Sequence, residues 1–439
     1  MSSRPARWAC AMTAMLACAG AAAACEAPAA LDGPRAGHAP AAQGPRLYTR
    51  TFWDAQSFDG RPGRRATVQS LRVDYDASCP LAHAVIGLNV SLFAAWKLAG
   101  SDNAGTLAQV DDAGRSLDDR AWAAVGQYML TLDAGNVDAK LGLQRANGQY
   151  FAGKENRALP PTFRGLSVVS KAGPLHVEAG TFDAVLGRGH AHLGRLSSAY
   201  GGTEIPRLGY LGAALDAQGS GVSVFIERAE NVWDKLYLES RYATAAPSSV
   251  QWTAVANLYL TKDQGRHAQG KLKGQAFSVA IGAKQGAYAT VVAYQKIASD
   301  QVHDFVAETA GASLANQMFM DFGAPHEQSL QVRGEVDGAR VGWPGLTLAL
   351  WKVWGWGADG QAMALVHGAP DDALHSLYWR DAQPVHGRHW EVGLNAAYVF
   401  QHGHDRNARL KLFAARHTAD AFYSDGNAAE YRLMLDFSF

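Results

Sequence analysis

The sequence is short of charge, of cysteine and of long apolar runs, and each shortage excludes a class of protein. Charged residues make up 18% of the 439 residues and the formal net charge is zero, so no surface for a polyanion is indicated and nucleic acid is not an expected partner. Of the four cysteines, Cys10 and Cys18 lie in the N-terminal apolar segment, and the other two, Cys25 and Cys79, are too few for a disulfide framework. Beyond the N-terminal segment, no stretch approaches the ~18 consecutive apolar residues of a transmembrane helix.

Recognisable motifs for metal binding and hydrolysis are also missing. His190 with His192, and His402 with His404, form same-face pairs on a strand, but a metal site needs more ligands. No nucleophile elbow lies near the available serines. We therefore expect no catalytic residue, no metal and no cofactor, and keep a hydrolase only as an alternative.

The N-terminus is typical of a secretory signal. Arg4 and Arg7 form a basic start, and an Ala-rich apolar stretch follows that ends in small residues suited to an A-x-A cleavage site. We expect a signal peptide over residues 1–24 and a short N-terminal extension over residues 25–46. A short membrane anchor and a lipidated Cys25 are the alternatives.

Alternation of apolar and polar residues dominates the rest of the chain. In the last segment, Tyr431, Leu433 and Leu435 alternate with Arg432 and Asp436. Because successive side chains of a strand point to opposite faces, such a segment has one apolar and one polar face. The same period recurs over residues 71–76, 222–227, 252–260 and 330–337.

Two all-β architectures give this pattern: a soluble antiparallel sheet, and a membrane barrel with lipid outside and water inside. Alternating segments run from about residue 47 to the last residue, with no helical stretch between them. Aromatics such as Tyr398 and Phe400 lie at segment ends, where interfacial girdles need them. Charges such as Arg333 and Lys411 lie in mid-segment, where a water-filled lumen tolerates them. These features favour the barrel.

The length of the alternating region sets the size of this barrel. Roughly 400 residues at roughly 22 per strand and connection give about 18 strands, and such a barrel leaves a channel unless loops fold inward. We therefore expect a transmembrane antiparallel β-barrel over residues 47–439 in a bacterial outer membrane, with the lipid bilayer around it. The final strand, which ends on Phe439, is expected to pair with the first and to be recognised by the barrel-assembly machinery.

Four stretches, kept in order and spacing, resemble the porin D (OprD-like) family of substrate-specific outer-membrane channels. Asn156–Gly165 is similar to the family's D-x-R-L-L-P-x-T-F-x-G, and Gly180–Asp183 to its A-G-R-F-D. The others are Asn316–Asp321 with Glu327–Arg333 and Pro344–Thr347, and Glu430–Leu433.

The resemblance implies a monomeric barrel of about 18 strands, with inward-folded loops that narrow the pore. It implies passive diffusion of small polar solutes such as amino acids, small carboxylates or, in some branches, chitooligosaccharides, and no cofactor. We expect solutes that bear a carboxylate. A sugar porin of the same fold is one alternative, and an outer-membrane hydrolase or a plugged structural or adhesin barrel is another.

Selectivity in a passive channel needs fixed charges at a narrow place. Lys154 and Arg157 lie, by strand count, in the third external loop, which folds into the lumen in many porins. We expect Arg157 to offer its planar fork to a solute carboxylate, and Lys154 to add a looser positive charge. A solvated loop charge is the alternative for each.

Further charges lie on the polar faces of later segments. Arg333, Lys411 and Arg409, together with Arg432, are expected to form a basic track down one wall of the lumen. The resemblance places Lys411 on one arginine of the family's basic ladder. A lumen charge paired with a neighbouring acid is the alternative for each residue.

Asp321 and Glu227 are expected to supply the opposing negative side.

A tryptophan cluster replaces the arginine that follows P-G-L-T in the family. It is either a girdle that faces lipid or a stacking surface for sugars inside the pore. Trp351 and Trp354 differ by three positions, so a regular strand places them on opposite faces. The cluster consists of Trp343, Trp351, Trp354 and Trp356.

Overall fold

The computed structural model describes residues 44–106, 120–217, 219–244, 249–311, 313–401 and 408–439. The expected signal peptide, the extension up to residue 43, and the pair His402 and His404 lie outside these residues. The first strand begins at Gly44, slightly before the expected start of the barrel at residue 47.

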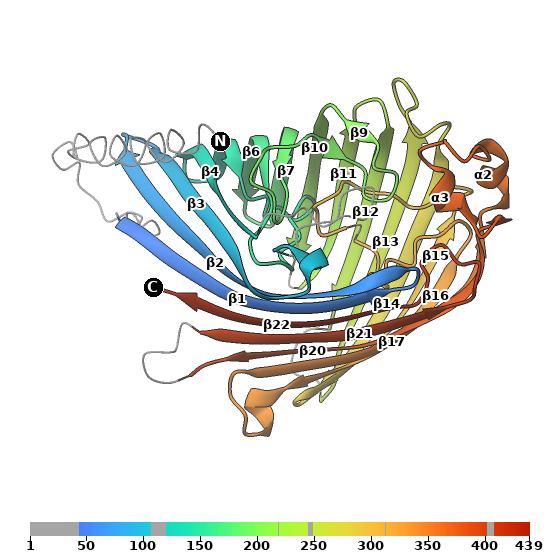
Figure 1. Cartoon of the computed structure of the whole chain (residues 1–439). Helices are drawn as coiled ribbons and strands as arrows, with labels where there is room; N and C mark the ends of the chain where they lie inside the picture. The colour runs from blue at the N-terminus through green and yellow to red at the C-terminus, as the bar shows by residue number, and fades with distance from the viewer. Residues whose placement is uncertain (1–43, 107–119, 218, 245–248, 312, 402–407) are drawn as a thin grey trace.

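Eighteen antiparallel strands form one closed sheet, which confirms the predicted barrel and its strand number. Closure comes from the pairing of the first strand with the last, in a register that runs from Tyr48 opposite Ser438 to Phe58 opposite Ala428, and the two strands lie side by side in Figure 1. The strands are β1 (Gly44–Phe58), β2 (Arg61–Pro80), β3 (Val85–Gly100), β4 (Ala121–Asp133), β5 (Val137–Gln144), β6 (Thr162–Ala172), β7 (Leu175–Leu186), β10 (Leu208–Ala217), β11 (Ser220–Ala229), β12 (Trp233–Ala243), β13 (Gln251–Asp263), β14 (Lys273–Gln285), β15 (Tyr288–Ala298), β16 (Gln328–Asp337), β17 (Leu346–Asp359), β20 (His386–Val399), β21 (Arg409–Ala419) and β22 (Ala428–Ser438).

The alternation predicted from the sequence separates the two faces of the barrel wall. On β22, Tyr431 and Leu433 point outward and are 49% and 39% exposed, whereas Glu430 and Arg432 point inward and are buried. An apolar outer face in contact with hydrocarbon and a polar inner face are what a transmembrane barrel requires.

The connections differ strongly between the two ends of the barrel. At one end, short turns join the strands, and glycines such as Gly135, Gly173 and Gly286 adopt positive φ there. The other end carries the long connections, which are extracellular in barrels of this kind. Those used below are loop 3 (145–161), loop 4 (187–207), loop 7 (299–327), loop 8 (360–385) and loop 9 (420–427).

Short helices and strands lie in the connections at both ends of the barrel. In the part of the chain that the structure describes, no helix is both long and apolar enough to cross a bilayer. Loops 4 and 8 each contain one antiparallel pair of two-residue strands. The small elements are η1 (Asp102–Ala104), β8 (Leu196–Ser197), β9 (Glu204–Ile205), η2 (Gly338–Val341), α2 (Gln361–Val366), α3 (His375–Tyr378), β18 (Trp379–Arg380) and β19 (Gln383–Pro384).

Candidate functional site

Loop 3 crosses the lumen and is held there by backbone hydrogen bonds to loop 7. Lys154 N–H donates to the carbonyl of Glu308 at 2.9 Å, and Ala310 N–H donates to the carbonyl of Ala152 at 2.8 Å. Loop 4 joins the same layer, because Ala307 N–H donates to the Ser197 carbonyl at 2.8 Å. Three loops therefore form one hydrogen-bonded layer inside the barrel, in agreement with the predicted inward folding.

The first half of loop 3 packs against aromatic side chains on one side of the lumen. Tyr150 stacks on Phe225 of β11 with ring centroids 4.9 Å apart, and Phe151 stacks on Phe182 of β7 at 5.0 Å. Tyr210 lies close to both loop residues. This aromatic side of the lumen, formed by inward residues of β6, β7 and β10–β13, is filled by side chains.

Cavities lie on both sides of the loop layer. One of about 470 Å³ is lined by loop 3 together with Asp138, Lys140 and Lys171, toward the end with short turns. Another of about 370 Å³ is lined by parts of loops 7, 8 and 9, including Trp379 and Asp425, toward the end with long loops. The loop layer therefore lies between two cavities inside the barrel.

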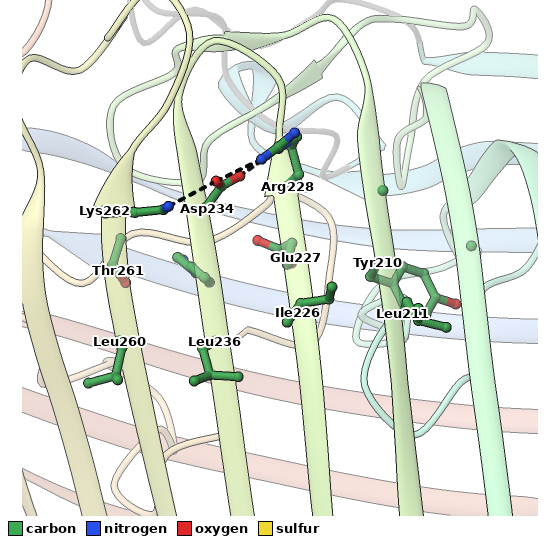
Figure 2. A pocket seen from close by; sticks show the side chains of 13 residues that line it. Tyr210, Leu211, Ile226, Glu227, Arg228, Asp234, Leu236, Leu260, Thr261 and Lys262 are labelled. Atoms are coloured by element: carbon green, nitrogen blue, oxygen red, sulfur yellow. Dashed lines mark hydrogen bonds and ion pairs between the residues drawn. The ribbon is translucent and has the colours of Figure 1, made fainter.

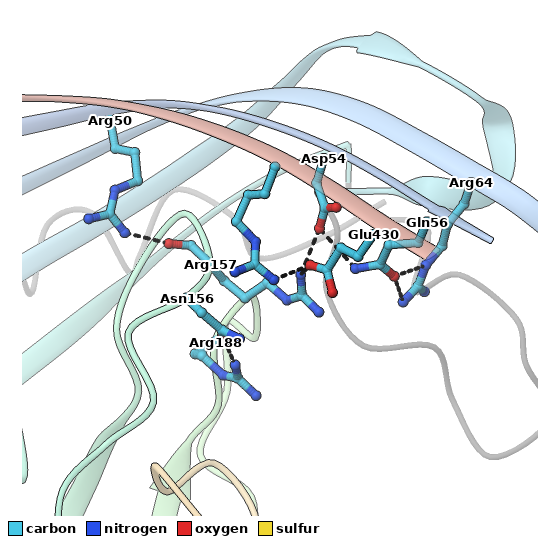
Figure 3. Close-up of polar contacts among 9 residues, drawn as sticks. Arg50, Asp54, Gln56, Arg64, Asn156, Arg157, Arg188 and Glu430 are labelled. Atoms are coloured by element: carbon cyan, nitrogen blue, oxygen red, sulfur yellow. Dashed lines mark hydrogen bonds and ion pairs between the residues drawn. The ribbon is translucent and has the colours of Figure 1, made fainter. Parts of the chain in front are cut away.

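The second half of loop 3 reaches the opposite wall, where Arg157 meets two carboxylates. Arg157 Nη1 donates to Asp54 Oδ2 of β1 at 2.6 Å and to Glu430 Oε1 of β22 at 3.0 Å. Figure 3 shows this guanidinium between the two acids, with Arg50 Nη1 donating to the Arg157 carbonyl at 2.6 Å. Arg432 also donates to Glu430. Loop 3 thus spans the lumen from the aromatic side to the strands that close the barrel.

The charge of Arg157 is stabilised at this position. Burial lowers the pKa of Arg157, but the carboxylates of Glu430 and Asp54 outweigh it and raise that pKa above its ordinary value. Among the described residues, no hydrogen-bond partner occupies its Nε and Nη2 atoms, and these atoms are not among the buried ones left without partners. Part of the guanidinium fork therefore remains accessible from the lumen.

A basic strip continues from Arg157 toward the end with short turns. Arg157 lies in loop 3, and the other members face the lumen from adjacent strands, because β21 pairs with β22 and β22 pairs with β1. Asp436 is shared among them: Arg50 Nη2 donates to it at 3.0 Å, and the Lys411 ammonium lies 3.6 Å from it. The strip consists of Arg50, Arg157, Arg409, Lys411 and Arg432, and its acidic partners are Asp54, Glu430 and Asp436.

The placement of Arg333 differs from the expected track. Arg333 lies on β16, and β17 and β20 separate that strand from β21. Its Nε atom pairs with Glu335 at 2.8 Å. The track predicted from the sequence therefore comprises Lys411, Arg409 and Arg432 without Arg333, because proximity in a barrel follows strand order and not the shared polar face alone.

Lys154 and Asp321 come together in the loop layer. Burial lowers the pKa of the Lys154 ammonium, and the nearby Asp321 carboxylate acts in the opposite direction. The Tyr200 hydroxyl of loop 4 donates a hydrogen bond to Asp321. Asp321 thus lies in the loop layer and interacts electrostatically with Lys154.

Glu227 lies on the aromatic side, where it holds loop 3 in place. Its carboxylate accepts a hydrogen bond from Trp233 Nε1 at 2.7 Å and one from the Tyr150 hydroxyl at 3.2 Å. Glu227 is buried by these contacts. Its position supports a structural role for a residue that we expected on the solute path.

Arg188 of loop 4 was not identified from the sequence. Its Nε atom donates to Glu308 at 2.8 Å, and its Nη1 atom donates to Asn156 of loop 3. The Arg188 guanidinium, aided by its backbone N–H, lowers the pKa of Glu308 despite the opposing effect of burial. One arginine therefore links loops 3, 4 and 7. Arg188 and its partner Asn156 lie in loops, where no alternation of apolar and polar residues assigns a side chain to the lumen.

Trp351 and Trp354 lie on opposite faces of β17, as their spacing predicts. Trp351 points inward, is 3% exposed, and donates through Nε1 to Glu391 at 2.6 Å. Trp354 points outward and is 38% exposed. The outward position of Trp354 agrees with the girdle interpretation, and the buried ring of Trp351 offers little surface for stacking.

Comparisons with known proteins agree with this geometry. The family described as outer membrane porin, OprD family, matches residues 44–439. Porin D of Pseudomonas aeruginosa is 26% identical over 413 residues, which cover 89% of each protein. The crystal structure of OccD3 (OpdP) from the same organism has a TM-score of 0.78 at 27% identity, with 91% of each chain covered. OpdK, at 22% identity and a TM-score of 0.77, covers 90% of this chain and 98% of its own, and shows the shared fold.

A closed 18-stranded barrel with an apolar outside, a charged lumen and inward loops is a channel through an outer membrane. The family match covers all of the described barrel, and the OprD family consists of channels and not of enzymes. This chain therefore belongs to the OprD family of outer-membrane porins.

Proposed function

We propose that the channel favours small solutes that carry a carboxylate, and that Arg157 and the basic strip select them. The observation that carries this proposal is the arrangement of charge at the constriction. Four basic side chains, Arg50, Arg157, Lys411 and Arg432, pair with three carboxylates of β1 and β22, and a fifth, Arg409, lies opposite Asp436 in register. The strip therefore keeps a surplus of positive charge after its internal pairs are counted.

The ion pairs within the basic strip are compatible with a role in selectivity, because they fix the position of its charges. An arginine without partners would swing into solution, whereas Asp54 and Glu430 hold Arg157 at one place in the lumen. A fixed charge between low-dielectric walls attracts a counter-ion more strongly than the same charge in open water. A carboxylate that loses hydration at the constriction meets the accessible edge of Arg157, whose geometry allows a bidentate contact.

A relative supports the same class of solute. OpdK was crystallised with vanillate, which is an aromatic carboxylate. The alternative of a sugar porin relies on tryptophan rings that are exposed in the lumen. The inward ring of Trp351 is buried. A sugar channel needs exposed aromatic faces along the path, and the aromatic side of the lumen is instead filled by Tyr150 and Phe151.

We further propose that the protein works as a monomer. The chain closes its own barrel through β1 and β22, and the constriction is built from loops 3, 4 and 7 of that chain. No second copy is needed to complete the lumen.

The first test compares two arginines of the strip in planar bilayers under a KCl gradient. We expect Arg157→Ala to lower the permeability of chloride relative to potassium roughly fivefold, which corresponds to about 1 kcal/mol, because it leaves Asp54 and Glu430 without their shared cation. Arg432→Ala is the matched control and is expected to have a smaller effect, since Arg432 pairs with Glu430 on the wall and does not lie in the crossing loop. Equal reversal potentials for the two variants would contradict the proposal.

The second test identifies the solute class. In liposome swelling with the unmodified protein, we expect benzoate and succinate to pass faster than arginine and faster than neutral sugars of similar size. The order should be lost in Arg157→Ala. Faster swelling with N-acetylglucosamine dimers than with benzoate would favour the sugar porin instead.

A further inference from the structure

A row of charged side chains crosses four strands on the outside of the barrel. Arg228 of β11 is paired in register with Asp234 of β12, Asp234 with Lys262 of β13, and Lys262 with Lys273 of β14. We call these four residues the outer charged row. Figure 2 shows the first three of them pointing to the same side of the wall.

The outer charged row has a positive surplus. Arg228 donates to Asp234 through Nε at 2.7 Å and through Nη2 at 2.9 Å, while the Lys262 ammonium lies 3.7 Å from the same carboxylate. Arg228 and Lys262 are 64% and 71% exposed, whereas Asp234 is 18% exposed. Lys273 is exposed, and no ion pair of it is found among the described residues. One shielded carboxylate therefore stands among three accessible cations.

An apolar row lies directly beneath the charges. Leu211 pairs in register with Ile226, Ile226 with Leu236, and Leu236 with Leu260, and three of these four are exposed on the outer face. Gly209, opposite Arg228, has no side chain to fill the space above Leu211. The apolar row and three members of the outer charged row, Arg228, Asp234 and Lys262, line a groove of about 690 Å³ on the outer wall, and Lys273 lies beside it.

The position of this groove along the barrel indicates what covers it. β11 ends at Ala229 and β13 at Asp263, so the outer charged row is the last outward row of these strands at the end of the barrel that carries the long loops. In a membrane barrel the apolar band contacts acyl chains, and charges just above it lie at the level of lipid headgroups. The groove therefore meets a headgroup with its upper half and hydrocarbon with its lower half.

We propose that this groove binds a phosphorylated, multiply acylated lipid of the outer leaflet. Its phosphate lies between Arg228 and Lys262, and an acyl chain lies along Leu211, Ile226 and Leu236. An arginine fork and a neighbouring ammonium suit a phosphate, whose charge exceeds that of the single carboxylate already present. The site is on the opposite face of the wall from the solute path, so it is a function separate from transport.

The test uses native mass spectrometry of the detergent-solubilised protein with bisphosphorylated lipid A as the probe. We expect the double variant Arg228→Gln and Lys262→Gln to bind lipid A at least roughly tenfold more weakly than the unmodified protein. Arg164→Gln is the matched control, because Arg164 is also an exposed outward arginine with a bidentate aspartate partner, Asp183. Its lipid affinity should stay close to that of the unmodified protein.

A substitution of opposite sign separates binding from misfolding. Asp234→Asn removes the competing carboxylate, so we expect it to bind lipid A more tightly than the unmodified protein, and a folding defect cannot produce that result. Single-channel conductance should be unchanged in all these variants. Equal lipid affinity in the double variant would overturn the proposal. So would equal binding of fully dephosphorylated lipid A, or displacement by inorganic phosphate at millimolar concentration, which would indicate a site for free anions.

Discussion

The two sides of the lumen use inward-facing positions in different ways. On the aromatic side, Tyr150 and Phe151 of loop 3 stack on Phe225 and Phe182 of the wall. On the side where the barrel closes, loop 3 contacts the wall through the ion pairs of Arg157. One loop thus has a packed end and a charged end.

This contrast shows how one loop can be anchored in a large barrel by two kinds of contact. A barrel of 18 strands encloses more space than its own side chains fill, and on the aromatic side rings occupy part of that space, with the buried carboxylate of Glu227 hydrogen-bonded to Tyr150 and Trp233. We propose that this packing fixes the position of loop 3 in the lumen, and that the basic strip selects which solutes pass. The following predictions separate these two roles.

The largest effect is expected from a substitution in the aromatic end of loop 3, and it is an effect on stability. Phe151→Ala should lower the free energy of unfolding by about 3 to 5 kcal/mol, because Phe151 is 3% exposed and contacts the rings of Phe163, Phe182 and Tyr210. Urea unfolding in detergent, followed by tryptophan fluorescence, measures it. Conductance should rise as the lumen widens, while the ratio of chloride to potassium permeability stays the same.

Phe277→Ala is the control for the loss of an aromatic ring. Phe277 lies on the outer face of β14, opposite Lys296 and Leu258 in register, where acyl chains occupy the space that the ring leaves. Its substitution should destabilise the barrel less and leave conductance unchanged. A change of ion preference in Phe151→Ala would mean that packing and selection are not separate.

The sequence predicts the barrel well because its signal is local. The alternation at Tyr431, Leu433 and Arg432 assigns each side chain to a face, and the structure agrees. Closure is also accessible to sequence reasoning, since a barrel of this kind pairs its last strand with its first. The register of that pairing, which places Arg50 opposite Asp436, comes only from the structure, and Arg50 was therefore absent from the predicted track.

The ion-pair partners of Arg157 cannot be predicted from the sequence in the same way. Arg157 lies 103 residues from Asp54 and 273 from Glu430 along the chain, and no period relates a loop residue to a strand residue. The depth to which loop 3 enters the lumen depends on the packing of Tyr150 and Phe151, which requires the three-dimensional wall. The sequence therefore identified Arg157 as a basic residue of an inward-folded loop, but it did not identify the ion pairs of Arg157.

An intermediate effect is expected from Lys154 as pH changes. Burial lowers the pKa of its ammonium below the ordinary value for lysine, so its charge is present at low pH and is lost as pH rises through that lowered value. Chloride preference should therefore decrease between neutral pH and pH ~10. The hydroxyl of nearby Tyr200 does not interfere, because burial raises its pKa well above the ordinary value.

The matched variant for this titration is Lys154→Gln, in which the chloride preference should be lower at neutral pH and should no longer change over the same range. Reversal potentials at a series of pH values measure both effects. An unchanged pH dependence in Lys154→Gln would assign the titration to another group.

The smallest effect is expected from Arg333, the basic residue that shares a polar face with the strip but not its place in the barrel. Arg333 is separated from β21 by two strands, and its charge is compensated by Glu335 at 2.8 Å. A compensated charge beside water, screened within about 8 Å at physiological ionic strength, adds little to the potential at Arg157. Arg333→Ala should therefore shift the reversal potential by less than half as much as Arg157→Ala. A shift of equal size would place the selective path along β16, and the basic strip of β1, β21 and β22 would lose its assigned role.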